Sequence, residues 1–163
     1  MVCTRSASVD EDNRQIYFSA NGMEAGEDPY LIRYYRIGFD GKGLTCLTPE
    51  EGMHRAWFSG DMKYLVDVYS MVDKVPVAVL RSARDGKVAM PLETADITLL
   101  EAEGWKAPEV FVAKGRDGKT DMWGLIARPT NLTRTRNIRL SNTFIRVPET
   151  SMFRRLSVLM TGI

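Results

Sequence analysis

WKAPEVFVAKGRDGKTDMWGLIARP, residues 105–129, decides the fold class, because two alternating stretches within it flank a polar turn. Residues 109–113 and 122–128 carry apolar side chains at every second position, many of them β-branched or aromatic, which is typical of half-buried strands. The intervening GRDGK is rich in residues that tolerate left-handed backbone angles. The stretch therefore predicts a β-hairpin.

Upstream of the hairpin, short stretches rich in aromatic and β-branched residues alternate with turn-forming residues. These predicted strands are residues 15–20, 30–40, 44–47, 54–59, 64–70, 75–82 and 88–92. They predict two antiparallel meanders, and their length and spacing favour a sandwich or a propeller. The expected fold is mainly β, with about two blades of a partial β-propeller over residues 1–93.

Residues 94–104, TADITLLEAEG, interrupt this succession of strands and predict a short helix. Thr94 or Asp96 is a candidate N-cap, and Gly104 is a candidate left-handed stop. The helical face is expected to carry Ile97 and Leu100, with Leu99 beside them. Because a helix is foreign to a pure meander, we expect a domain boundary here, with residues 94–131 forming a linking helix and hairpin.

The 163 residues, 44% apolar and 26% charged, are sufficient for one domain with a core. No apolar run approaches the thickness of a bilayer, and residues 1–14 lack the hydrophobic centre of a signal peptide. Neither a membrane span nor an export signal is expected, and the compartment stays open.

Few residues have the chemistry of a catalytic or metal site. Cys3 and Cys46 have no C-x-x-C spacing, and His54 is the only histidine, so no zinc site and no other cofactor is expected. His54 is interpreted as a strand-end or surface histidine, because the sequence identifies no partner for a catalytic base. No nucleophile elbow or phosphate-binding glycine loop occurs either. We therefore predict no catalytic, substrate-binding or metal-binding residue in this chain.

Three D-G-K segments begin at Asp40, Asp85 and Asp117. They lack the alternating acidic residues of a calcium loop and are interpreted as type I′ turns.

Two other groups of residues have a conceivable binding role. Glu24, Glu27 and Asp28 have the chemistry to hold a substrate amine, but a solvated acidic loop is the preferred interpretation. The tryptophans and tyrosines are interpreted as core and sheet-face residues rather than as a ligand cage.

The last thirty-one residues, 133–163, differ in charge from the rest, with six arginines and one acidic residue. An arginine-rich tail suggests a nucleic-acid binder, since guanidinium groups bind phosphate well. This hypothesis ranks last, because the preceding residues are mildly acidic and their aromatic residues show no RNA-binding signature.

Three runs taken in order resemble one family. They are IYFSANGMEAGEDPYLIRYYRIGFDGKGLTCLTPEEGMH (residues 16–54), FSGDMKYLVDVYS (58–70) and APEVFVAKGRDGKTDMWGLIARPTN (107–131). They resemble the closing part of the propeller in dipeptidyl peptidase IV-like serine peptidases of the prolyl oligopeptidase clan, where the hairpin leads into an α/β-hydrolase domain.

The resemblance implies a propeller that gates access to a Ser-Asp-His site removing dipeptides from peptide amino termini. In the family the triad lies downstream of the matching region, and the acidic residues that hold the substrate amine lie upstream. The resemblance therefore assigns no site residue to this chain. Family members are often periplasmic, secreted or at the cell surface.

After Asn131 the resemblance ends. The family shows a string such as FDPxKKYPVIEYIYxGP where residues 132–148 read LTRTRNIRLSNTFIRVP. Permitted codons for this tail, read one base out of phase, encode a family-like string that includes YPVIEYIYPGP. We hypothesise that residues 132–163 are an out-of-frame tail. Sequencing the coding DNA tests this, and the absence of a one-base deletion near the Asn131 codon relative to close relatives contradicts it.

The predicted object is thus a fragment of a dipeptidyl peptidase IV-like protein, inactive alone, whose exposed strand edges favour self-association. A free-standing β-rich module that binds peptide or glycan is the alternative.

Overall fold

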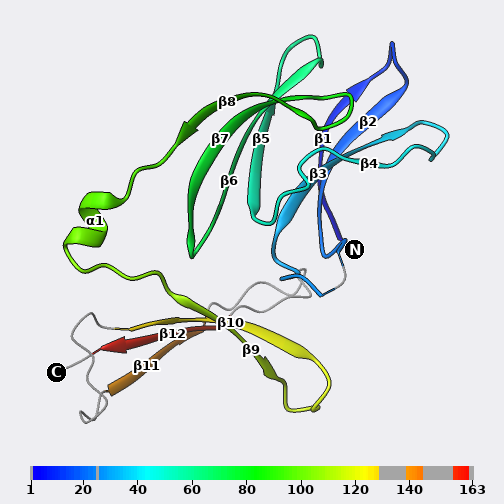
Figure 1. Ribbon diagram of the computed structural model, residues 1–163. Helices are drawn as coiled ribbons and strands as arrows, with labels where there is room; N and C mark the ends of the chain where they lie inside the picture. The colour runs from blue at the N-terminus through cyan, green and yellow to red at the C-terminus, as the bar shows by residue number, and fades with distance from the viewer. Residues whose placement is uncertain (1, 25, 129–138, 145–155, 162–163) are drawn as a thin grey trace. The chain divides into compact units, whose positions relative to one another are not determined.

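The computed structural model describes residues 2–24, 26–128, 139–144 and 156–161 (Figure 1). Its contacts divide the chain into two units, Met1–Ala95 and Asp96–Ile163. Each unit is described by itself.

The first unit begins with a four-stranded antiparallel sheet in chain order. Its strands are β1 (Val2–Asp10), β2 (Gln15–Asn21), β3 (Ile32–Gly38) and the short β4 (Thr45–Cys46). The predicted strands correspond to β2, β3 and β4. The sequence pattern missed β1, because its residues are mostly polar and its hydrogen bonds depend on pairing with β2, from Val2 opposite Asn21 to Asp10 opposite Gln15.

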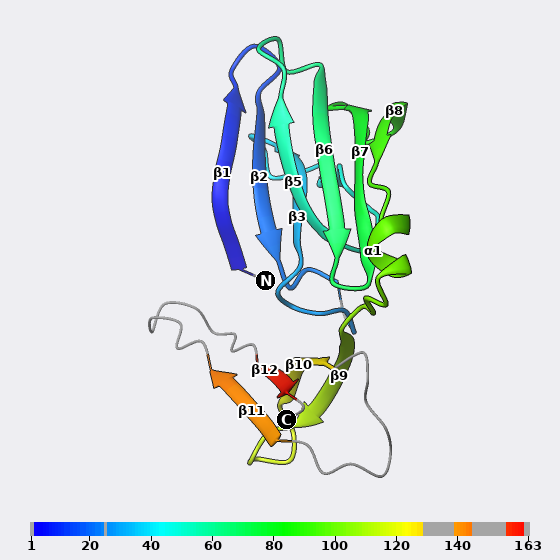
Figure 2. The same cartoon turned by 90° about the vertical axis from the view of Figure 1, so that its left-hand side faces the viewer.

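A second four-stranded antiparallel sheet follows, again in chain order. Its strands are β5 (Met53–Phe58), β6 (Tyr64–Met71), β7 (Lys74–Ser82) and β8 (Val88–Thr94). Figure 2 shows these strands side by side, with β5 nearest to the first sheet. Two successive four-stranded meanders confirm the predicted fold class, a partial propeller of about two blades.

An apolar cluster joins the two sheets of this unit. Its buried members are Tyr17, Leu47, Leu65 and Ala83. The Phe58 ring from the second sheet meets the Tyr17 ring edge-on, with ring centroids 5.1 Å apart. Each sheet therefore buries one face against the other, as layered β structures require.

The D-G-K turns form, but the predicted type I′ geometry is wrong. That type needs a positive φ at both central residues, whereas only the glycine after each aspartate has one: 74° at Gly41, 72° at Gly86 and 67° at Gly118. Each aspartate side chain instead accepts a hydrogen bond from the backbone N–H two residues later, as in an Asx turn.

The second unit contains the helix α1 (Thr98–Ala102) and a sheet with the strand order β11-β12-β10-β9. The strands are β9 (Glu109–Lys114), β10 (Asp121–Ala127), β11 (Arg139–Phe144) and β12 (Leu156–Thr161). Strands β9 and β10 are the predicted hairpin, paired from Asp121 opposite Lys114 to Ile126 opposite Glu109. β12 pairs parallel to β10. Most of the tail to which the out-of-frame hypothesis applies lies outside the described residues.

Helix α1 is shorter than predicted, and its predicted N-cap is wrong. The N-cap position falls on Ile97, which has no side-chain oxygen to offer. Asp96 nevertheless accepts a hydrogen bond from the Thr98 N–H at 2.9 Å. Gly104, with a φ of 83°, occupies the predicted left-handed position after the helix. Since Leu99 and Leu100 are exposed, the expected apolar face does not form a core.

Candidate functional site

The most densely connected polar residues of the first unit are Glu50, His54, Asp67 and Arg81, here called the buried ionic cluster. Strand alternation points His54, Asp67 and Arg81 to the inner face of the second sheet. The Asp67 carboxylate is 0% exposed. It accepts a hydrogen bond from Arg81 Nε at 2.8 Å and lies 2.9 Å from His54 Nδ1. An aspartate so buried requires partners of this kind.

Arg81 is satisfied on three sides. Besides Asp67, its guanidinium donates to the Gly86 carbonyl oxygen at 3.0 Å and to the Glu50 carboxylate. The Tyr69 ring lies beside the cluster, stacked on the His54 ring with centroids 5.1 Å apart and 6.0 Å from the guanidinium carbon. Charge pairing and ring contacts together hold this arginine inside the sheet.

His54 lies at the beginning of β5, as the strand-end interpretation predicts, but it is not a surface residue, because only 1% of it is exposed. Its partner Asp67 comes from the neighbouring strand, thirteen residues away in sequence. Its Nε2 atom faces the Glu50 carbonyl oxygen at 2.8 Å. Both ring nitrogens thus face oxygen atoms of the chain itself. Neither nitrogen is left open to a substrate.

Gly86 completes the cluster at the turn between β7 and β8. A Cβ atom at this position would lie 2.6 Å from the Leu47 carbonyl oxygen and 2.7 Å from the Leu47 Cα. Because its φ is also positive, glycine is required here for two independent reasons. The close approach brings the turn against the first sheet. The buried ionic cluster thereby links residues 50–86, and its chemistry is structural.

The acidic loop between β2 and β3 is only partly solvated, because Glu24 is exposed whereas Asp28 is buried. Its carboxylates turn toward Arg33, whose side chain is largely buried. Arg33 Nη2 donates to Glu27 at 2.7 Å, and Arg33 Nη1 lies 4.0 Å from Glu24. Asp28 is itself buried and accepts a hydrogen bond from the Tyr30 N–H at 2.9 Å. The interpretation as a solvated loop is therefore right for Glu24 and wrong for Asp28, and Glu27 is partly buried by its pairing with Arg33.

Cys46 has the properties of a structural rather than a reactive thiol. Burial raises the pKa of this thiol above its ordinary value, which disfavours the nucleophilic thiolate. Within residues 8–24 and 26–128, whose side chains are described, no three His, Cys, Asp or Glu side chains are placed to share a metal ion. In the part of the chain that the structure describes, no helix is long and apolar enough to cross a membrane.

An open groove of about 670 Å³ lies where β1, β2 and β3 meet β5. Tyr34, Trp57 and Phe58 border it, and none of its described lining residues is charged. A peptide amino terminus is normally held by a carboxylate. The groove therefore offers aromatic surface without the group that would orient such a substrate.

Comparison with known proteins agrees with this architecture. Residues 1–76 match the family model of the dipeptidyl peptidase IV (DPP IV) N-terminal region. No curated protein sequence matches the chain.

Two solved structures are similar. A dipeptidyl aminopeptidase IV candidate from Bacteroides ovatus is 22% identical with a TM-score of 0.59, and the match covers 80% of this chain and 18% of that chain. Dipeptidyl peptidase 4 from Porphyromonas gingivalis is 17% identical with a TM-score of 0.66, over 97% of this chain and 24% of that chain.

The chain thus spans about a fifth to a quarter of the length of the structures that it matches. At this level of identity the two structures establish a shared fold, and the family model matches residues 1–76 of the 163-residue chain. These findings fit a fragment of the N-terminal propeller region of a dipeptidyl peptidase IV-like protein.

Proposed function

We propose that this chain contributes to the propeller that gates and scaffolds the peptidase site of a dipeptidyl peptidase IV-like serine exopeptidase. The observation that carries the proposal is the family match over residues 1–76, which span the first sheet and the strands β5 and β6 of the second. The polar residues of these sheets support a scaffolding role. In the buried ionic cluster Arg81 pairs with Asp67, and in the acidic loop Glu27 pairs with Arg33. These charged side chains therefore bind one another within the chain and not a substrate.

The chain alone is proposed to have no peptidase activity. Serine peptidase chemistry needs a nucleophile in hydrogen-bond reach of a base that has a free lone pair. Both nitrogens of His54 are occupied by Asp67 and by the Glu50 carbonyl oxygen. The only histidine of the chain therefore has a structural role and does not serve as the base of a serine peptidase.

A chromogenic Gly-Pro substrate tests this proposal. The purified chain is expected to release no chromophore above the buffer blank, whereas a full-length dipeptidyl peptidase IV serves as the positive control. Turnover that copurifies with the chain and is abolished by a serine-directed inhibitor would contradict the proposal. A His54→Gln variant, with folding checked by circular dichroism, then shows whether that turnover uses the histidine.

A further inference from the structure

A small cavity lies between the first sheet and the loop that joins β2 and β3, on the face of this sheet that points away from the second sheet. Tyr34 meets the Phe58 ring of the second sheet edge-on. Strand alternation therefore directs its neighbours Arg33 and Tyr35 to the opposite face. Ala20, which stands opposite Arg33 in the strand register, shares that face. Arg33 and Tyr35 are nevertheless buried, with exposed fractions of 7% and 3%.

The cavity has a volume of about 10 Å³, which is close to the space that one water molecule needs. All of its wall residues lie between residues 20 and 35, on the two strands and on the loop that joins them. This hairpin therefore forms the cavity by itself, without a neighbouring sheet or another chain. The buried wall residues are Ala20, Asp28, Leu31, Arg33 and Tyr35.

Two buried polar atoms that belong to wall residues have no hydrogen-bond partner among the described residues: Arg33 Nε and Tyr35 Oη. The other side of the guanidinium is paired, since Arg33 Nη2 donates to Glu27 at 2.7 Å. The Cys46 thiol lies near the Tyr35 hydroxyl, but not in hydrogen-bond geometry. A buried N–H or O–H group without a partner loses the free energy of its hydration. The cavity thus combines space for a small polar molecule with two groups that need a partner.

We propose that this cavity binds one internal water molecule, which accepts a hydrogen bond from Arg33 Nε and forms another with the Tyr35 hydroxyl. Burial raises the pKa of Tyr35 above its ordinary value, so the hydroxyl keeps its proton and has both a donor and an acceptor to offer. Glu27 and Asp28 also line the cavity, and their carboxylates accept the remaining protons of the water. Buried water molecules typically make about three hydrogen bonds, which this set of partners supplies.

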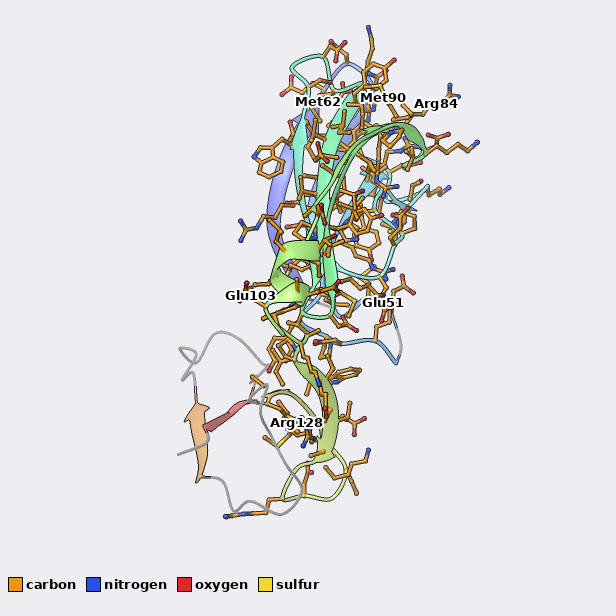
Figure 3. The ribbon with its side chains drawn as sticks, turned by 60° about the vertical axis from the view of Figure 1, so that its left-hand side comes forward. Glu51, Met62, Arg84, Met90, Glu103 and Arg128 are labelled. Carbon is orange, nitrogen blue, oxygen red and sulfur yellow. The ribbon has the colours of Figure 1, made fainter. Side chains whose placement is uncertain are left out.

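The role of the internal water is to complete the solvation of a buried arginine. Arg84 gives the contrast, because it lies on the exposed turn between β7 and β8, where Figure 3 labels it, and bulk water reaches its guanidinium. Arg33 depends instead on groups of the chain and on the internal water. Since Glu27 belongs to the loop and Tyr35 to β3, the water and the guanidinium together fasten the acidic loop to the sheet. This role needs no substrate and is independent of the proposed peptidase scaffold.

A crystal structure of the chain, at a resolution that shows ordered water, tests the proposal directly. One water molecule is expected within hydrogen-bond distance, about 2.7–3.2 Å, of both Arg33 Nε and Tyr35 Oη. A map that shows other ordered water molecules but no density between these two atoms would overturn the proposal. Density that contacts only one of the two atoms would overturn it as well, because the water would then not bridge them.

NMR gives a second reading in solution. In water-selective NOE and ROE spectra of the nitrogen-15-labelled chain, the Arg33 Nε–H group is expected to show cross-peaks of opposite sign with water. This sign pattern marks a water molecule that stays bound for longer than the protein takes to tumble. The Arg84 Nε–H group is the reference in the same spectra, because only short-lived surface water reaches it. The same sign pattern for both arginines would show that the cavity holds no long-lived water.

A cavity-filling variant distinguishes the water from an exchanging hydroxyl proton. Ala20→Val adds two methyl groups to the cavity wall and is expected to expel the water, so that the Arg33 cross-peaks are lost. Ala113→Val, at an exposed position of β9, is the matched control and is expected to keep them. Cross-peaks that survive in Ala20→Val would come from the Tyr35 hydroxyl and contradict the proposal. Circular dichroism verifies the fold of both variants, and the crystal structure of the unchanged chain decides the question without either of them.

Discussion

Asp67 is the residue on which the polar contacts of the second sheet converge. It is 0% exposed and bridges an arginine and a histidine from the two strands that flank its own. A buried ion pair contributes little net stability compared with apolar residues of the same volume. Removing one partner is nevertheless costly, because it leaves a buried charge without a counter-charge. Its role is thus to make one strand register much more favourable than its neighbours.

The Asp67→Asn variant is expected to lower the free energy of unfolding by about 3–5 kcal/mol, because Arg81 then lacks its fully buried counter-charge. A loss of this size is comparable with the total stability of a small domain, so the cooperative transition is expected to shift strongly or vanish. Urea unfolding followed by circular dichroism measures it.

The control for this variant is Asp73→Asn, which removes the same charge from the exposed turn between β6 and β7. Its effect is expected to stay within about 0.5 kcal/mol. Equal effects of the two substitutions would show that the buried ionic cluster does not secure the fold.

The burial of His54 illustrates what sequence alone leaves undetermined. Its residue type is compatible with both a surface and an interior position, and its partner Asp67 lies on another strand. A signal was present: the short turn between β5 and β6 and the alternation of both strands place His54, Ala56 and Phe58 on one face with Asp67. Using it requires the register, which the sequence pattern does not fix.

Among the elements, the turn of the β9-β10 hairpin contains an acidic side chain with several hydrogen bonds. Asp117 accepts hydrogen bonds from the Thr120 hydroxyl and from the backbone N–H groups of Lys119 and Thr120. These bonds favour the ionised carboxylate and lower the pKa of Asp117 from 3.8 to about 2. The turn is therefore bound by its own acidic residue.

Because the pKa of Asp117 is lowered in the folded hairpin, its bonds stabilise the turn at pH values above 3.8, and this contribution is lost as the pH falls through about 2. The Thr120→Val variant is expected to raise the pKa of Asp117 toward 3.8, because the Thr120 hydroxyl is the largest cause of the shift. NMR titration of the carboxyl carbons measures it.

The matched control is Thr98→Val, which removes the hydroxyl that lowers the pKa of Asp96 at the start of α1. It is expected to leave the titration of Asp117 unchanged. An unchanged Asp117 titration in Thr120→Val would show that the backbone N–H groups alone cause the shift.

The strands were predictable where a stretch of alternating apolar and polar residues is bounded by turn-forming residues. Strands β2, β3, β5 to β7, β9 and β10 lie within a few residues of their predicted bounds for this reason. β1 was not predictable, because a polar strand is stabilised by its neighbour and not by its own pattern. The helix was overestimated because Leu99 and Leu100 provide a helical pattern with no described core to cover them.

For the molecule as a whole, the first unit holds the features that a fold of its own requires. The apolar cluster and the buried ionic cluster both lie within Met1–Ala95. A chain that ends at Ala95 is therefore expected to keep a cooperative thermal transition in its β-sheet circular dichroism signal. Since few apolar residues are fully buried, the transition is expected at a modest temperature. A gradual, non-cooperative melt would show that residues after Ala95 complete this core.

The spacing of the buried ionic cluster also has a use in tracing distant relatives. His54 precedes Asp67 by thirteen residues, and Asp67 precedes Arg81 by fourteen. Apolar core positions accept many substitutions of similar volume, but an ion triad tolerates almost none singly. A search pattern built on these two intervals, with glycine five residues after the arginine, is therefore expected to detect the same blade in proteins whose apolar residues have diverged beyond alignment.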